Sequence, residues 1–218
     1  VILRSLRTKP GNLFSKLDIK RTYFDLAGMQ FFDPQQIGQD IQPNQQDNTV
    51  DVHWTLVEKG SSQVQLQAGY GGNSFIGTLG LTFNNFSLRN FLKLKDFKPV
   101  PQGDGQMLSV QAQAGQYFKN YSLSFTEPWL FGNRPTALSV SLNQAMVNYK
   151  DYTGASQKLN IFSASAGLNR LLNWPDNYFS LYTGISFQSY NFKNYPFQFG
   201  STTVSNGNAK KFSFNIGL

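Results

Sequence analysis

The chain has 218 residues, a formal net charge of +7 from 19 basic and 12 acidic side chains, and no cysteine. Without thiols it has neither disulfides nor thiolate metal sites. Its lysines and arginines are scattered instead of clustered, which disfavours a nucleic-acid partner. No apolar run approaches the roughly 18 residues that a membrane-spanning helix needs.

Two helices are expected at the start of the chain. Residues 1–8 (VILRSLRT) predict a short helix that ends at the Pro-Gly pair 10–11. Ser15 and Asp18 have the spacing of a capping box and predict the start of a stronger helix. Gly28 is its expected C-terminal cap.

Two strands follow these helices. Residues 32–41 predict a strand that is interrupted near Pro34, and residues 44–48 form a polar turn. The next strand alternates apolar and polar residues, its apolar members being Val50, Val52, Trp54 and Leu56. About sixty residues are few for an independent core, and an additional first strand would complete the fold. We therefore expect residues 1–60 to be one incomplete α+β domain.

From residue 61 onward the sequence predicts long strands, and the first two form a hairpin over residues 63–86. Val64, Leu66, Ala68 and Tyr70 share one face of the first strand, and Gln63, Gln65, Gln67 and Gly69 share the other. The turn Gly71-Gly72-Asn73-Ser74 supplies residues that tolerate a positive φ. The hairpin thus has one apolar face and one uncharged polar face.

Six further segments repeat this alternation, which makes about eight strands in all. They are expected near residues 108–115, 121–126, 138–146, 162–169, 179–187 and 212–218. A tilted strand needs about 9–11 residues to cross a bilayer, and these segments are of similar length. Gln, Ser, Thr and Gly on the polar faces, in place of Lys and Glu, favour a transmembrane antiparallel barrel over a soluble β-sandwich.

Aromatic residues gather in every second connection of this predicted wall. Trp129 and Phe131 lie in one such connection, and Trp174 lies in another. Aromatic residues at one end of antiparallel strands are typical of a membrane-interface girdle.

No enzyme chemistry is expected. The one histidine, His53, lies two residues from Asp51 on the polar face of a strand, and nothing supplies a nucleophile elbow. The GYGG segment precedes a strand and not a helix, so it is no phosphate loop. We expect no metal site and no cofactor.

Several motifs resemble the BamA-type outer-membrane β-barrel assembly factors, a family that also contains TamA-like and two-partner-secretion barrels. LRTKPGNLFSKLDIKRTYFDLAGMQFFDP and VDVHWTLVEKG are similar to the end of a POTRA domain, the soluble repeat of this family. AGYGG, NNFSLRN and SFTEPWLFGNRP are similar to the barrel.

The resemblance implies an incomplete last POTRA domain over residues 1–60 and the N-terminal half of an outer-membrane barrel over residues 61–218. Barrels of this family have sixteen strands, so the chain is expected to be a piece of a longer protein. The implied location is the bacterial outer membrane, with residues 1–60 in the periplasm. The implied partners are unfolded outer-membrane proteins, accessory subunits of the assembly complex and outer-membrane lipid, and no nucleic acid.

The resemblance also implies a lateral gate at the first barrel strand, where a client strand pairs. Its residues are Gln63, Val64, Gln65, Leu66, Gln67, Ala68, Gly69 and Tyr70. Two other functions stay open: a transport barrel of the same family, TamA-like or of the two-partner-secretion type, and a passive small outer-membrane barrel or pore.

Overall fold

The structure is a computed structural model that describes residues 6–29, 32–60, 62–71, 74–91, 100–131, 136–150, 154–172, 174 and 179–218. It divides into two compact units, which are treated separately below. The first unit comprises Val1–Ser62 with Asn84–Gly105, and the second comprises Gln63–Phe83 with Gln106–Leu218.

The first unit contains helix α2, Lys16–Gly28, whose start was predicted correctly. Ser15 is the N-cap, and its Oγ accepts a hydrogen bond of 3.3 Å from the backbone N–H of Asp18, which satisfies one of the unpaired donors of the first turn. The C-terminal cap is Met29 and not Gly28, which is the last helical residue. No helix in the described ranges is both long and apolar enough to cross a membrane.

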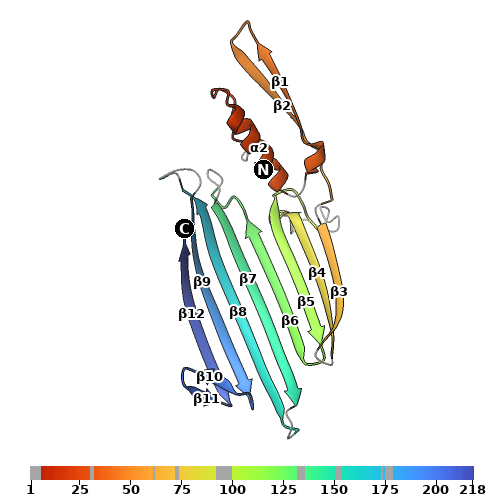
Figure 1. Ribbon diagram of the computed structural model, residues 1–218, viewed down its shortest axis with the longest axis vertical. Helices are drawn as coiled ribbons and strands as arrows, with labels where there is room; N and C mark the ends of the chain where they lie inside the picture. The colour runs from red at the N-terminus through yellow and green to blue at the C-terminus, as the bar shows by residue number, and fades with distance from the viewer. Residues whose placement is uncertain are drawn as a thin grey trace. The chain divides into compact units, whose positions relative to one another are not determined.

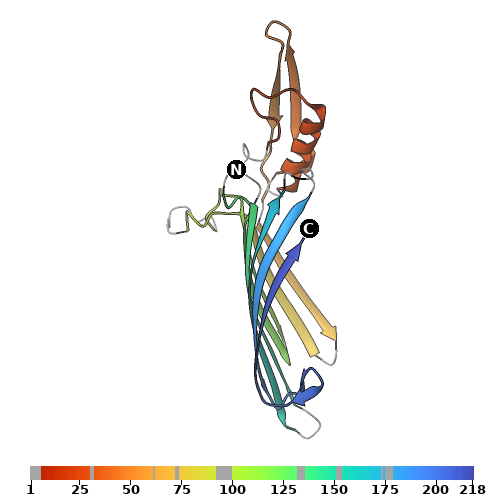
Figure 2. The ribbon, with the colours of Figure 1, turned by 90° about the vertical axis from the view of Figure 1, so that its left-hand side faces the viewer.

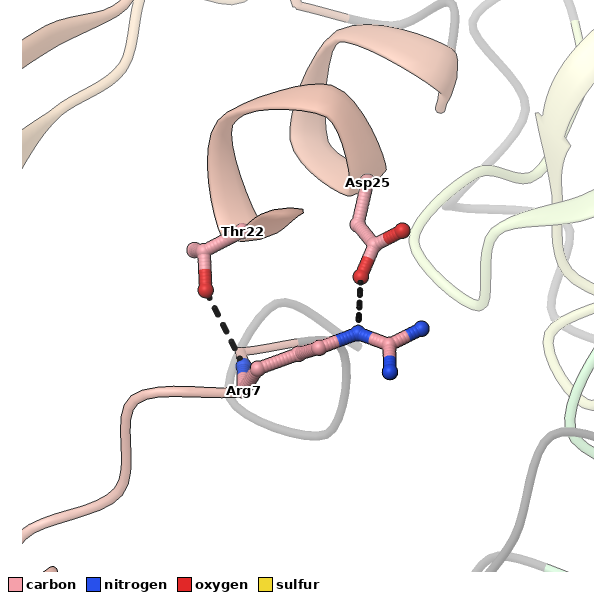
Figure 3. Close-up of polar contacts among 3 residues, drawn as sticks. All are labelled: Arg7, Thr22 and Asp25. Atoms are coloured by element: carbon pink, nitrogen blue, oxygen red, sulfur yellow. Dashed lines mark hydrogen bonds and ion pairs between the residues drawn. The ribbon is translucent and has the colours of Figure 1, made fainter. Parts of the chain in front are cut away.

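The segment before α2 is held against this helix by Arg7 (Figure 3). Its backbone N–H donates to Oγ1 of Thr22 at 3.1 Å, and its Nε donates to Oδ2 of Asp25 at 2.9 Å. Residues 6–8 are irregular, so the predicted helix 1–8 is wrong in this part, and residues 1–5 lie outside the described ranges. Arg7 thus bonds to Thr22 and Asp25, which lie one turn apart on α2, and the segment around Arg7 is not itself helical.

A small core lies beneath α2. Leu26 is fully buried and Phe32 is 1% exposed, and Leu6, Met29, Ile37, Trp54 and Leu56 pack against the pair. Asp33 caps the short 3-10 helix η1, Pro34–Gln36. The backbone N–H of Gln35 and the side-chain amide of Gln36 both donate to Asp33, and they hold the pKa of its carboxyl below the ordinary value.

Strands β1, Gly38–Asn44, and β2, Thr49–Thr55, form an antiparallel hairpin. The residues of β2 alternate between exposed and half-buried, as the sequence predicted. The interruption predicted near Pro34 is confirmed by η1, but the strand predicted over residues 32–41 is corrected in its bounds, because β1 starts only at Gly38 and runs to Asn44. The Asp33 cap and Pro34 at the first helical position explain why the chain turns there. Identification of this unit as a POTRA domain stays a prediction.

The connection between β4 (Ser74–Phe86) and β5 (Gln106–Gly115) also belongs to the first unit, and polar contacts join its two ends. Ser87 is fully buried; its Oγ donates to Oδ2 of Asp104 at 2.5 Å and accepts from the backbone N–H of Asn90 at 3.2 Å. The side-chain oxygen of Asn85 accepts from the backbone N–H of Gly105 at 3.0 Å. The NNFS part of the NNFSLRN motif therefore fixes the two ends of this connection to each other.

The second unit is built on one antiparallel sheet of eight strands in the order β12-β9-β8-β7-β6-β5-β4-β3 (Figure 1). Its strands are β3 (Ser62–Gly71), β4 (Ser74–Phe86), β5 (Gln106–Gly115), β6 (Phe118–Glu127), β7 (Thr136–Lys150), β8 (Ser156–Leu171), β9 (Ser180–Lys193) and β12 (Gly207–Gly217). All eight predicted strands are confirmed, and the fold is mainly β. The turn at 72–73 lies outside the described residues.

The two faces of the sheet differ in chemistry. Leu123, Leu142, Ala164, Phe187 and Phe212 are paired successively across β6 to β12, and they form an apolar row. On the other face, hydroxyl side chains occupy one register level on seven strands, a feature that we call the hydroxyl row: Thr82, Ser109, Ser124, Ser141, Ser165, Ser186 and Ser213. The apolar and uncharged polar faces were thus correctly predicted.

A small hairpin lies between the strands that were predicted near residues 179–187 and 212–218. It consists of β10, Phe197–Phe199, and β11, Thr202–Val204, while β9 and β12 both extend further than predicted. The ring of Phe197 stacks on Phe192 at 4.8 Å and contacts Tyr190 at 5.3 Å. Tyr190 and Phe192 lie an odd number of residues from Phe187, which is on the apolar face of β9, so their side chains are on the polar face. The β10–β11 hairpin that contacts them therefore covers the polar face. Figure 2 shows this hairpin on the side toward which the wall curves.

Candidate functional site

Strand β3 is one of the two edges of the eight-stranded sheet. All eight residues of the predicted gate, Gln63 to Tyr70, lie within it, and every one of them is exposed. Val64 is 73% exposed and Leu66 is 80% exposed, whereas apolar residues in the middle of the wall, such as Val140 at 37%, are more covered. The structure therefore places the predicted residues together on one edge strand of the sheet that these 218 residues form, while their role stays a prediction.

Glycines make the contact between β3 and β4 sparse. A Cβ on Gly80 would lie 3.4 Å from the Cβ of Gln65, so Gln65 occupies space that Gly80 leaves. Gly69 has no atom within 4 Å of where its Cβ would be. Near the turn, the ring centroids of Tyr70 and Phe75 are 4.8 Å apart. Because cross-strand side-chain contacts stabilise a strand pair, Gly69 and Gly80 each remove one such contact from this hairpin.

The chemistry available at this edge is that of the peptide backbone. An edge strand presents a row of N–H and C=O groups that its own sheet does not pair, and another extended chain can bind to them. On the polar face beside it, Gln67, Gly69, Ile76, Thr78 and Gln113 border a shallow hollow. Side chains of an added strand would thus find room next to β3.

A feature that sequence reasoning missed lies further along the wall. The ring of Tyr182 covers two paired glycines: a Cβ on Gly184 would lie 2.6 Å from its Oη, and a Cβ on Gly167 would lie 2.8 Å from it. Tyr182 is on the polar face, two residues before Gly184 on the same strand. An aromatic residue spaced by two from a glycine was the signal that could have revealed this contact.

The predicted interface aromatics lie where the chain turns between strands. Trp129 and Phe131 lie in the β6–β7 connection and Trp174 in the β8–β9 connection, at the same end of the sheet. Phe131 is 69% exposed and Trp174 is 82% exposed. Trp129 is half-buried, and its backbone N–H donates to the carboxylate of Glu127 at 3.0 Å. Their contact with a membrane interface stays a prediction.

His53 lies on β2 opposite Asp40 and is exposed. Among the residues that the structure describes, no three His, Asp or Glu side chains are close enough together to hold a metal ion.

The wall resembles a known class of outer-membrane protein. The crystal structure of BamA from Haemophilus ducreyi lacking POTRA domains 1–3 matches 99% of this chain with a TM-score of 0.62 at 17% sequence identity, and this match covers 40% of that chain. The likeness shows that the sheet has the fold of the N-terminal half of such a barrel.

Sequence comparison agrees with the fold. A protein of Treponema pallidum (strain Nichols) named "Putative outer membrane protein assembly factor" is 28% identical over 134 residues, which are 61% of this chain and 15% of that protein. The chain thus spans only a part of the relatives it matches.

The family model of the Omp85 superfamily domain matches residues 102–218. These residues hold β5 to β12, whereas β3 and β4 precede them. Since the match covers more than half of the sequence, the chain belongs to the Omp85 superfamily.

Proposed function

We propose that this chain is part of a BamA-type assembly factor that inserts β-barrel proteins into the bacterial outer membrane, and that β3 is the strand at which a client pairs. Three observations support the proposal: membership of the Omp85 superfamily, the name of the Treponema relative, and the glycines Gly69 and Gly80 in the β3–β4 hairpin. The glycines carry the argument, because neither a passive pore nor a simple scaffold needs a first strand that is weakly held.

The physical driving force would come from the backbone groups of β3 that become unpaired when this strand opens. Within a bilayer each unsatisfied N–H or C=O costs several kcal/mol, so an incoming strand that pairs with this edge is strongly favoured. Sparse packing against β4 keeps the edge easy to open. Strand pairing is noncovalent, and the proposal therefore involves no catalytic residue, nucleotide or cofactor.

The proposed partners are unfolded outer-membrane proteins, accessory subunits of an assembly complex and outer-membrane lipid. Residues 1–60 are proposed to be the last POTRA domain and to lie in the periplasm. At the family level this assigns the protein to the bacterial outer membrane, and the specific assembly role is what the next experiment tests.

Disulfide capture should distinguish β3 from the middle of the wall. Gln65→Cys and Ser141→Cys are compared in the full-length protein for trapping of a stalled client that carries one cysteine in its last strand. Both residues lie on the polar face, but Ser141 is on β7, which is paired on both sides by β6 and β8. These 218 residues contain no cysteine, and any cysteine elsewhere in the full-length protein is first replaced by serine to remove background. Residues opposite each other have Cβ atoms about 4.5–5.5 Å apart, which is close enough for a disulfide after small adjustments.

We expect capture at Gln65→Cys and not at Ser141→Cys. Absence of capture at Gln65→Cys with every client position would contradict the gate. Equal capture at both positions would instead support the second candidate, a transport barrel, because a polypeptide passing through the lumen would touch the hydroxyl row. That row is the observation that keeps this second candidate in consideration.

A sidedness experiment tests the proposed orientation. The β6–β7 connection lies at the end of the sheet where β3 begins, and β11 and β12 are joined near the other end. A membrane-impermeant thiol reagent applied to intact cells should therefore label Ser205→Cys and leave Asn133→Cys unlabelled, with both labelled after lysis. The reverse pattern in intact cells would overturn the periplasmic placement of residues 1–60.

A further inference from the structure

Five lysines occupy one face of the sheet near one end, and we call this set the lysine belt: Lys119, Lys150, Lys158, Lys193 and Lys210. Each lies an even number of residues from a member of the apolar row on its own strand, and the ladders joining β6 to β12 continue without interruption. Because side chains alternate along a strand, the belt shares the face of that row. The ring contact between Phe187 and Phe212 at 4.8 Å confirms that the row lies on one side.

The belt is exposed and has no acidic neighbour on the strands. All five lysines are exposed. Across the described strands of the sheet, Glu127 is the one acidic residue, and it ends β6 at the opposite end from Lys119. Surface lysines of ordinary sheets are usually interspersed with carboxylates, whereas the positive charge of this belt is uncompensated within the sheet.

Two members of the belt repel each other directly. Lys158 on β8 and Lys193 on β9 are opposite each other in the antiparallel ladder. Residues paired in this way have Cβ atoms about 4.5–5.5 Å apart, and like charges there destabilise the pairing. An anion placed between the two ammonium groups would convert this repulsion into attraction. The pair therefore indicates a negatively charged ligand.

The apolar surface next to the lysine belt indicates what kind of anionic ligand would bind. A hollow in the apolar face has Ala164 and Ala166 on β8, with the larger Leu142 and Phe187 on either side. Lys210 lies two residues beyond Phe212, and Lys193 lies six residues beyond Phe187. At about 3.4 Å per residue these lysines are roughly 7 and 20 Å along the strands from the apolar row. A ligand with an apolar chain and an anionic head matches this arrangement.

We propose that the lysine belt binds the headgroup phosphates of net-anionic membrane lipids whose acyl chains lie in the hollow over Ala164 and Ala166. Phosphates sit near Lys158, Lys193 and Lys210, which relieves the repulsion in the Lys158–Lys193 pair. This site is on the lipid-facing side and is separate from the edge of β3, so it goes beyond the proposed insertion function. It depends only on the sheet being embedded in a bilayer.

Lipid selectivity can be measured by electron paramagnetic resonance on the full-length protein in phosphatidylcholine vesicles. Trace spin-labelled phosphatidylglycerol is compared with spin-labelled phosphatidylcholine, and the motionally restricted fraction of each reports contact with the protein. We expect several-fold preference for phosphatidylglycerol. The variant Lys158→Gln/Lys193→Gln/Lys210→Gln should bring the ratio close to one, with a loss of up to about fivefold per lysine.

Lys211→Gln is the matched control. Lys211 adjoins Lys210 and is equally classed as exposed, but it pairs with Gln188 on the polar face. It should leave the preference unchanged. Should the triple variant fail to fold, Lys158→Gln alone serves, because it removes one of two facing like charges and should not weaken the ladder.

Several outcomes would overturn the proposal. The proposal is wrong if the unaltered protein restricts equal fractions of spin-labelled phosphatidylglycerol and phosphatidylcholine. That result is expected if the belt binds an acidic protein partner instead. Retention of the preference in the triple variant, or its loss in Lys211→Gln, would overturn the proposal as well. Client capture at Gln65→Cys is measured independently, so failure of either proposal leaves the other standing.

Discussion

Replacing Phe32 with alanine should lower the free energy of unfolding of the helix-containing unit by about 3–5 kcal/mol. Phe32 is 1% exposed and forms the core together with Leu26. Truncation removes the buried ring and leaves a cavity that two short strands and one helix cannot readily close. The measurement is urea-dependent protease digestion of the full-length protein in vesicles, in which the midpoint for cleavage within residues 6–60 is recorded.

Phe24→Ala is the control for this prediction. Phe24 lies on the same helix and is 70% exposed, with its ring at the edge of Tyr23. Its removal should change the free energy of unfolding by no more than about 0.5 kcal/mol. Similar shifts for the two variants would mean that Phe32 is not part of a core that supports this unit.

A second large effect is expected at the glycines beneath Tyr182. Gly184→Val should destabilise the sheet by about 1–3 kcal/mol, because an added Cβ would lie 2.6 Å from Oη of Tyr182 and must displace the ring. Thermal unfolding followed by loss of heat-modifiable mobility in gels would report the change. The lower transition temperature should appear without any change in strand content at low temperature.

Two further variants distinguish the clash with the Tyr182 ring from any general effect of a glycine-to-valine change on stability. Tyr182→Ala removes the obstacle, so adding Gly184→Val to it should cost little, and the two changes should be strongly non-additive. Gly217→Val should be nearly neutral, since no atom lies within 4 Å of the added Cβ position. Additive effects of Tyr182→Ala and Gly184→Val would show that the ring does not cover Gly184 in the folded protein.

The long strands were predictable because alternation of Leu138, Val140 and Leu142 with serines is a strictly local pattern. The same pattern predicted the polar and apolar faces of each strand. The small hairpin β10–β11 could not be predicted in this way. It is held by stacking of Phe197 on Phe192, and a contact between a loop and a neighbouring strand leaves no periodic trace.

Errors in the first unit have a similar origin. The stretch around Leu6 and Arg7 has the composition of a helix, but Arg7 bonds to Thr22 and Asp25 instead, so tertiary contacts override local propensity. At the candidate site the sequence placed Gln63–Tyr70 in one strand, and the structure agrees. The lysine belt depends on which strands are neighbours and in which register, information that the periodicity of any single strand does not contain.

The hydroxyl row has a consequence for anything that moves along the polar face. Strands of a closed barrel tilt by roughly 35–45° from its axis, so a line at right angles to the strands climbs as it goes round. With strands about 4.8 Å apart, the six steps from Thr82 to Ser213 rise by roughly 18 Å in total. The hydroxyls therefore form an oblique track through the membrane and not a ring at one depth. A passing chain would meet weak, uncharged hydrogen-bonding partners at successive depths.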